Sequence, residues 1–285
     1  MRNPIDVLKL LTETASVKGY TFERLYRNLY NPDFYLLAYK NIAASPGSMT
    51  TGADGLSIDN MSMARINKII ASLKDQTYQP NPARRTYIAK KNNPTKKRPL
   101  GIPSTNDKLV QEVIRMLLEA IYEPTFSNLS HGFRPKRSCH TALSQIKDTF
   151  TGVRWMVEGD IKACFDCFDH HVLINILRRR IKDEKFLSLM WKFLKAGYME
   201  QWEYHKTYSG TPQGSGMSPI LANIYLSELD TFMEEYKARF DTEPFKRNAS
   251  KEYEKIARRY RKAKKKLDAG DHSKEAVKSS KRPKS

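Results

Sequence analysis

Residues 153–171 read VRWMVEGDIKACFDCFDHH. A short apolar run ends at Asp160, which predicts a strand that carries this aspartate to its tip. Asp169 fits the N-cap of a following helix, so capping does not account for Asp160. A charge among apolar residues is costly unless something positive pairs with it, which favours a Mg²⁺ ligand at Asp160. The alternative, an ordinary turn residue beside Gly159, stays open at this point.

An aromatic residue and two cysteines follow this aspartate. Phe165 lies where a bulky group could contact the sugar of an incoming nucleotide, but Phe165 and Phe168 are equally typical of a core, and we expect at least one of them to be buried. The pair Cys164 and Cys167 has zinc-ligand spacing, yet no second Cys or His pair follows at ligand spacing. We therefore expect small buried cysteines and no zinc site.

The chain is strongly basic. Its 285 residues carry a formal net charge of +19. From residue 242 onward, 16 Lys/Arg face 6 Asp/Glu, a net charge of +10, and the preceding 241 residues carry the remaining +9. A basic globular part with a basic tail predicts a polyanionic partner bound in a salt-dependent way. The alternative is a soluble protein with a basic appendage. Three cysteines make no disulfide framework, which favours an intracellular setting.

Hydrophobic periodicity places the remaining elements. It predicts helices over 61–73, 104–121, 139–150, 218–240 and 251–267, and hairpins over 84–102 and 202–208. Ser104 or Thr105 fits the N-cap of the second helix, with Asp107 placed as in a capping box. Basic residues gather on the first hairpin, a shape suited to fold over a triphosphate. They are Arg84, Arg85, Lys90, Lys91, Lys96, Lys97 and Arg98.

Six segments occur in the order and spacing of a reverse transcriptase of the group II intron-encoded (maturase) type, which the chain resembles from about residue 20 to residue 240. They are GADG (52–55), RRTYIAK (84–90), KRPLGIP (97–103), HGFRPKRS (131–138), GDIKACFD (159–166) and TPQGSGMSPILANIYL (211–226). The family has Gly-Phe-Phe-Asp where residues 163–166 read ACFD, a change that keeps Phe165. The family's Tyr-Ala-Asp-Asp element is absent from these 285 residues. We therefore expect an amino-terminal portion of such a protein.

The resemblance implies an α+β fold: the fingers and partial palm of a right-hand polymerase, helix-rich, with a small antiparallel sheet and a fingertip hairpin. It implies Asp160 as the catalytic residue and as the ligand of two Mg²⁺ ions, assisted by the backbone carbonyl of Ile161. The dNTP contacts it implies are Lys90, Arg98, the sugar gate Phe165 and Gln213. The RNA or template contacts that we expect are Gly52, Asp54, Gly55, Arg84, Arg85, Arg134, Lys136 and Arg137.

The same resemblance organises the chain into four parts. We expect an N-terminal extension and helical fingers with a template-binding loop over 1–80, and further fingers over 81–150. A partial palm follows over 151–241, and a basic, partly disordered insertion or tail over 242–285.

The implied activity of the intact parent is RNA-directed DNA polymerase, with Mg²⁺, dNTPs and an RNA template with a DNA primer. Group II intron RNA is the implied partner, whose splicing and mobility the protein aids. We expect a cytoplasmic location, in the bacterial cytosol or nucleoid, no membrane partner, and no polymerase activity from this chain alone. The alternatives are an RNA-binding module only, or a retron or defence-type reverse transcriptase. The sequence leaves open which intron is served, whether this chain binds Mg²⁺, and whether it forms a homodimer.

Overall fold

A computed structural model describes residues 2–59, 61–90, 93–151, 153, 156–211, 214–240 and 251–270. The chain divides into a compact unit of residues 1–232 and a second unit of residues 233–285. The helices are α1 (Pro4–Ala15), η1 (Tyr26–Tyr30), α2 (Pro32–Ala43), α3 (Met63–Lys74), α4 (Thr105–Tyr122), η2 (Glu123–Thr125), α5 (Cys139–Thr149), η3 (Cys164–Asp166), α6 (His170–Arg180), α7 (Glu184–Leu194), α8 (Ser218–Phe240) and α9 (Lys251–Asp268). The strands are β1 (Ala83–Lys90), β2 (Asn93–Ile102), β3 (Tyr198–Glu200) and β4 (Glu203–His205).

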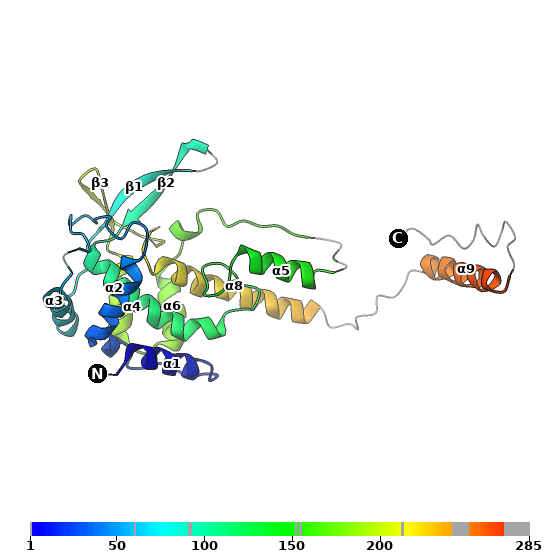
Figure 1. Ribbon diagram of the computed structural model, residues 1–285, viewed down its shortest axis with the longest axis horizontal. Helices are drawn as coiled ribbons and strands as arrows, with labels where there is room; N and C mark the ends of the chain where they lie inside the picture. The colour runs from blue at the N-terminus through cyan, green and yellow to red at the C-terminus, as the bar shows by residue number, and fades with distance from the viewer. Residues whose placement is uncertain are drawn as a thin grey trace. The chain divides into compact units, whose positions relative to one another are not determined.

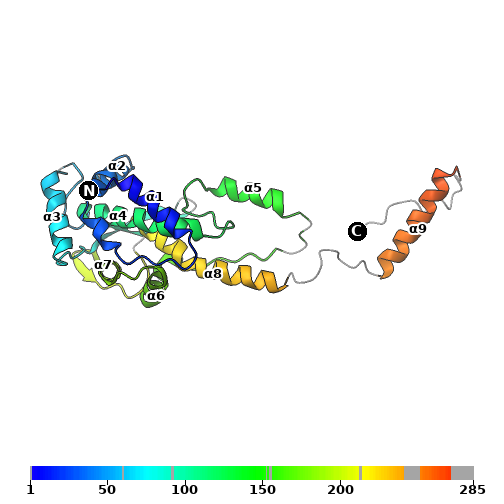
Figure 2. The ribbon, with the colours of Figure 1, turned by 90° about the horizontal axis from the view of Figure 1, so that it is seen from below.

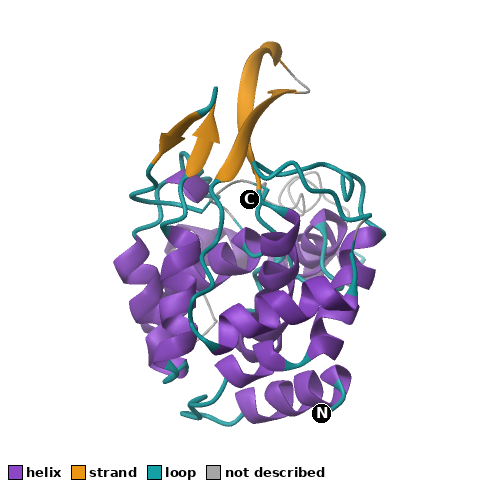
Figure 3. Cartoon of the chain, turned by 90° about the vertical axis from the view of Figure 1, so that its left-hand side faces the viewer, coloured by secondary structure: helices purple, strands orange, loops and turns teal. Residues whose placement is uncertain are grey.

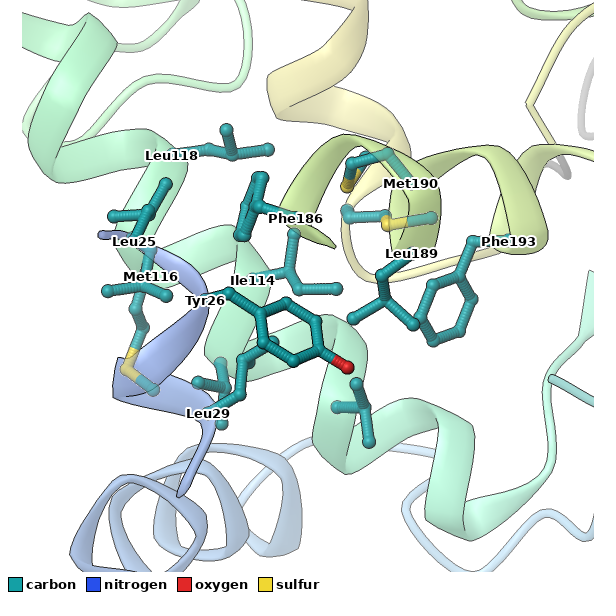
Figure 4. Close-up of a cluster of buried hydrophobic side chains, with 14 of the residues drawn as sticks. Leu25, Tyr26, Leu29, Ile114, Met116, Leu118, Phe186, Leu189, Met190 and Phe193 are labelled. Atoms are coloured by element: carbon teal, nitrogen blue, oxygen red, sulfur yellow. The ribbon is translucent and has the colours of Figure 1, made fainter. Parts of the chain in front are cut away.

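Helix α4 is the centre of the first unit. Of its 18 residues, 13 are buried, including polar ones, so it is covered on more than the single apolar face that its sequence predicts. In the view of Figure 2, α4 lies between α1 and α2 on one side and α6 and α7 on the other. Its side chains meet those of η1 and α7 in one apolar cluster (Figure 4). Burial of this helix therefore makes a large hydrophobic contribution to the fold.

Asp107 ties the start of α4 to the segment that leads into β1. Ser104 is the N-cap: its Oγ accepts from the Asp107 amide at 3.2 Å and donates to Asp107 Oδ2 at 2.6 Å. The Tyr78 hydroxyl donates to Oδ1 at 2.6 Å, and the Asn81 amide donates to Oδ2 at 3.0 Å. Asp107 is only 1% exposed, and this burial raises the pKa of its carboxyl. The three donors replace the water that the buried group has lost.

The strands form one four-stranded sheet in the order β2-β1-β3-β4. It lies at one edge of the helical body, and the β1–β2 hairpin projects from it (Figures 1 and 3). The pairs β1–β2 and β3–β4 are antiparallel, but β1 and β3 run parallel, with Ala83 opposite Tyr198. The prediction of an antiparallel sheet is therefore wrong, because the sheet is mixed. The long helical connection between β1 and β3 allows β3 to enter in the parallel direction.

Most of the other helices and strands predicted from the sequence are confirmed, and one hairpin has different bounds. The helices expected over 61–73, 104–121, 139–150, 218–240 and 251–267 are confirmed as α3, α4, α5, α8 and α9, and the first hairpin as β1–β2. The second hairpin starts earlier than expected, at Tyr198, because Gln201 and Trp202 form its turn, both with positive φ. Each described helix is too short or too polar to span a bilayer.

The strand expected to end at Asp160 is wrong for the described residues 153 and 156–161. They have no regular secondary structure and are exposed, with Val157 at 97%. A strand needs a neighbour to satisfy its N–H and C=O groups, and no described segment pairs with this one. Water satisfies the backbone of an exposed segment instead. The apolar pattern alone could not supply the missing neighbour.

Replacing Asp107 with alanine should lower the free energy of unfolding by about 3 kcal/mol or more, because the buried Ser104 and Tyr78 hydroxyls and the Asn81 amide lose their acceptor. Asp75→Ala is the matched control, since Asp75 is exposed at the end of α3 and its loss should cost less than about 0.5 kcal/mol. Urea denaturation followed by circular dichroism measures both. Equal stability of the two variants would contradict the role given to Asp107.

Candidate functional site

The turn that carries Phe165 is held by a distant part of the chain. The Thr211 amide donates to the Phe165 carbonyl at 2.7 Å, and the Gly210 amide donates to the Phe168 carbonyl at 2.7 Å. The Ser209 hydroxyl donates to the Asp166 carbonyl at 2.9 Å. We call this arrangement of residues 165–168 and 209–211 the clasp. It joins the GDIKACFD and TPQG segments, which the sequence had suggested as parts of one site.

Gly210 makes this approach possible. Its φ is +78°, and a Cβ on it would lie 2.5 Å from the Phe165 carbonyl oxygen and 2.7 Å from Asp166 Cα. Only glycine adopts this conformation at that distance from another backbone. The His170 ring is buried, with Nε2 at 2.7 Å from the Gly210 carbonyl oxygen. Burial lowers the pKa of His170, so the neutral ring is favoured beneath the clasp.

The Phe165 ring is half-buried and contacts two other aromatic rings. Its centroid lies 6.0 Å from that of Phe133 and 6.2 Å from that of Phe168, both edge-to-face. Phe168 is 3% exposed and stacks near Tyr225 at 4.6 Å, which confirms that one phenylalanine of the pair is in the core. Phe165 therefore has part of its ring available to a ligand, and Phe168 does not.

A cavity of about 320 Å³ lies beside Phe165. Phe133 and Asn223 also line it, and the Asn223 Nδ2 donates to the Gly132 carbonyl at 2.9 Å. These two residues were not singled out from the sequence, although both belong to segments of the matched pattern. The contact brings HGFRPKRS and the start of α8 to the clasp.

Ala163 precedes this turn in the left-handed conformation, with φ of +52° and ψ of +41°. An alanine there costs roughly 1 kcal/mol relative to glycine. The family pattern of the sequence analysis has glycine at this position, so alanine here places local strain next to Phe165. The sequence alone did not reveal this, because a residue type does not state its own φ.

Asp160 and Ile161 lie in the exposed segment just before the turn, with Ile161 51% exposed. Cys164 is half-buried and Cys167 is exposed, so the expectation of buried cysteines is wrong. Burial and the nearby charges of Cys167 and Asp160 raise the pKa of the Cys164 thiol. No group of three His, Cys, Asp or Glu suited to a metal occurs among the described residues. One carboxylate and one carbonyl fit a Mg²⁺ ion that takes its other ligands from water and substrate phosphates.

The hairpin carries a second set of predicted residues. Arg98 is exposed on β2, opposite Ile88. Lys90 ends β1, but its side chain lies outside the described residues, as does Gln213 entirely. Gly214 has a φ of +107°, and a Cβ on it would lie 2.6 Å from the Gly101 carbonyl oxygen. The end of the TPQG segment therefore contacts the base of the hairpin directly.

The loop over 51–57 is fixed to the start of α4. A Cβ on Gly52 would lie 2.6 Å from Ser104 Cα, so glycine is needed for packing there. Arg84 donates from Nε and Nη2 to the Thr51 carbonyl, at 3.1 and 2.8 Å. Asp54 and Gly55 form an exposed turn beyond this anchor, with the Leu56 amide donating to Asp54 Oδ1. Gly52 and Arg84 thus hold the loop, while Asp54 and Gly55 face solvent.

The basic loop over 131–138 also combines residues that hold the loop with residues that face solvent. Arg134 is 8% exposed; it donates to both Glu123 carboxylate oxygens and to the carbonyls of Ser127 and Ser130. Arg137 donates to the Asn128 carbonyl at 2.7 Å. Lys136 is exposed. Arg134 therefore shapes the loop from inside, and an RNA contact of this loop remains a prediction that Lys136 is best placed to make.

Residues 88–248 match the family model for reverse transcriptase (RNA-dependent DNA polymerase), and the chain belongs to this family. Its helix-rich fold with a small sheet is that of reverse transcriptase fingers and palm, as the resemblance implied.

Three relatives define the match more closely. Group II intron-encoded protein LtrA of Lactococcus lactis subsp. cremoris is 55% identical over 247 residues, which cover 85% of this chain and 41% of LtrA. An uncharacterized 91 kDa protein in the cob intron of Schizosaccharomyces pombe is 48% identical over 84% of this chain and 30% of its own length. Nuclear intron maturase 1, mitochondrial, of Arabidopsis thaliana is 30% identical over 46% of this chain and 26% of its own. The chain spans less than half the length of each.

Replacing Gly210 with alanine should destabilise the first unit by more than about 3 kcal/mol, because the new Cβ overlaps backbone as well as straining φ. Gly19→Ala is the matched control. Gly19 also has a positive φ, +79°, but has open space around it, so the cost should be near 1 kcal/mol. Thermal and urea unfolding measure both. Similar losses would mean that the clasp does not exist as described.

Proposed function

We propose that this chain supplies the fingers and part of the palm of an RNA-directed DNA polymerase of the group II intron-encoded type, and that it binds intron RNA to aid splicing and mobility. The observation that carries the proposal is the clasp, which unites two segments of the family pattern and leaves Phe165 half-exposed beside a cavity. The 55% identity to group II intron-encoded protein LtrA supports the intron type.

The arrangement suits nucleotide binding beside Phe165, with the triphosphate reaching the hairpin face that carries Arg98. Arg98, together with Lys90, would contact the triphosphate, since guanidinium and ammonium groups bind phosphate by charge-assisted hydrogen bonds. Phe165 would lie against the sugar of the dNTP, where a 2′-hydroxyl would clash with its ring. Gln213 would lie near the nascent base pair, next to the Gly214 contact with β2.

Asp160 and the Ile161 carbonyl would hold Mg²⁺. When bound, a pair of such ions stabilises the attacking and leaving oxygens of phosphoryl transfer. The chain's own residues position the dNTP and the primer end around that point. A two-ion site needs carboxylates beyond Asp160, and the described residues offer no cluster of three ligands. We therefore propose that this chain alone does not extend a primer.

Template and intron RNA would bind the exposed basic surfaces. Asp54 and Gly55 mark the template loop, and Lys136 marks the loop over 131–138. The exposed helix α9 adds a basic surface in the second unit. Lys136 and the basic residues of α9 would neutralise phosphates without reading base sequence, so they would contribute affinity and salt dependence.

A second candidate function is an RNA-binding module without a dNTP site, which the lack of a three-ligand metal cluster among the described residues favours. The two functions differ in their response to nucleotide. With Mg²⁺ present, the next complementary dNTP should slow dissociation of an RNA template–DNA primer from a polymerase portion. It should have no effect on an RNA-binding module.

Gel shifts with a group II intron RNA test the proposal. Affinity should fall at least a hundredfold between about 50 and 200 mM salt, because several phosphates are neutralised. A chain that lacks residues 242–285 should bind more weakly but still bind, since residues 1–241 carry a net charge of +9.

Two charge reversals control this experiment. Lys136→Glu should weaken intron binding at least about threefold, the loss expected for one phosphate contact. Lys18→Glu changes the net charge equally at another exposed lysine and should have a smaller effect. Salt-independent binding, or equal affinity for a plain RNA duplex of the same length, would count against the proposal.

A further inference from the structure

A second cavity, of about 300 Å³, lies between the base of the β1–β2 hairpin and residues 206–211. Arg85, Pro99, Asp166, Tyr198, Tyr208 and Thr211 are among its lining residues. It is distinct from the cavity beside Phe165, since the two share no lining residue. Arg85 pairs with Gly101, whereas Arg98 pairs with Ile88. Because successive side chains of a strand point to opposite faces, Arg85 and Arg98 lie on opposite faces of the hairpin. The cavity is therefore on the hairpin face opposite Arg98.

Two buried polar atoms without a hydrogen-bond partner belong to residues that line this cavity. They are Arg85 Nε and Thr211 Oγ1, and only one other such side-chain atom, Arg65 Nη2, occurs among the described residues. Thr211 as a whole is 3% exposed. Buried polar groups in folded proteins are nearly always hydrogen-bonded, so a pair of unpaired ones at one cavity indicates a ligand with complementary oxygens.

The arginine is held in place for such a ligand. Its guanidinium carbon lies 3.8 Å from the centroid of the Tyr198 ring, and the His205 ring stacks on Tyr198 at 5.0 Å with a 15° tilt. Gly197 allows the strands to approach, because a Cβ there would lie 2.5 Å from the His205 carbonyl oxygen. A cation stacked on an aromatic ring keeps its edge donors directed outward, as bidentate phosphate recognition requires.

The remaining lining residues specify the chemistry. Lys206 adds a second positive charge, so two cations face the single carboxylate of Asp166 in the lining, and Tyr208, 83% exposed, offers a ring face on which a base can stack. A phosphate between two cations, with a base on an aromatic ring, is how single-stranded nucleic acid is bound. The buried Thr211 hydroxyl can pair with a ribose 2′-hydroxyl, the group that distinguishes RNA from DNA.

We propose that this cavity binds one nucleotide of single-stranded RNA, outside the nucleotide-transfer site. The choice of RNA as the partner rests on the function proposed above. In that setting the cavity engages template or intron RNA on the outer face of the hairpin. It adds stacking and ribose recognition to the phosphate contacts of the basic surfaces.

Fluorescence anisotropy with a fluorescein-labelled U12 oligonucleotide tests this. Tyr208→Ala removes an exposed ring without disturbing the fold and should weaken U12 binding about tenfold. Lys206→Gln should weaken it about threefold. The matched controls Tyr20→Ala and Lys18→Gln alter exposed residues of the same types elsewhere and should stay within twofold of the unchanged chain. Thr211→Val should reduce the preference for U12 over dT12.

The outcomes separate this proposal from the one it rests on. If the unchanged chain binds neither U12 nor intron RNA, the proposed function fails. If it binds RNA but Tyr208→Ala and Tyr20→Ala bind U12 equally, the cavity is not a nucleotide site, although the proposed function stands. If Tyr208→Ala weakens binding of duplex RNA as much as binding of U12, the cavity assignment is also overturned, because the stacking position serves a single strand.

Discussion

The buried carboxylate of Asp107 is the interaction on which the placement of the hairpin depends. It holds the N-terminus of α4, the helix at the centre of the core, and it accepts from Tyr78 and Asn81 on the segment that enters β1. The hairpin therefore leaves the core at a fixed point. Arg84, the second residue of β1, donates to the Thr51 carbonyl and so fixes the loop over 51–57 to the hairpin.

The clasp is the counterpart of this anchor on the palm side. Gly210 lets residues 209–211 lie against the Phe165 turn, and the same segment then reaches the hairpin base through Gly214. The turn thus separates two cavities, with Phe165 lining one and Asp166 the other. One backbone arrangement sets the position of the proposed nucleotide pocket and of the proposed single-strand pocket, so a change in the clasp should affect both.

The sequence predicted what depends on neighbours along the chain. The Ser104 cap, the Asp169 cap and the first hairpin follow from local pattern, and all three are confirmed. Long-range partners could not be predicted in the same way. The parallel pairing of β3, the absence of a strand before Asp160 and the internal hydrogen bonds of Arg84 and Arg134 each depend on segments far along the chain. Some arginines and glycines of the family pattern therefore hold the fold together, such as Arg84 and Arg134, while others, such as Gly55 and Arg98, are exposed to solvent.

Amide hydrogen exchange, read residue by residue in the free chain, tests the central claim most directly. That claim is that the clasp is built before any ligand binds, whereas the segment with Asp160 is not. The amides of Gly210 and Thr211 should exchange far more slowly than those of residues 156–161, because the former donate to backbone carbonyls and the latter are exposed and lack regular secondary structure. Protection of residues 156–161 equal to that of α4, or rapid exchange at Gly210 and Thr211, would contradict the account.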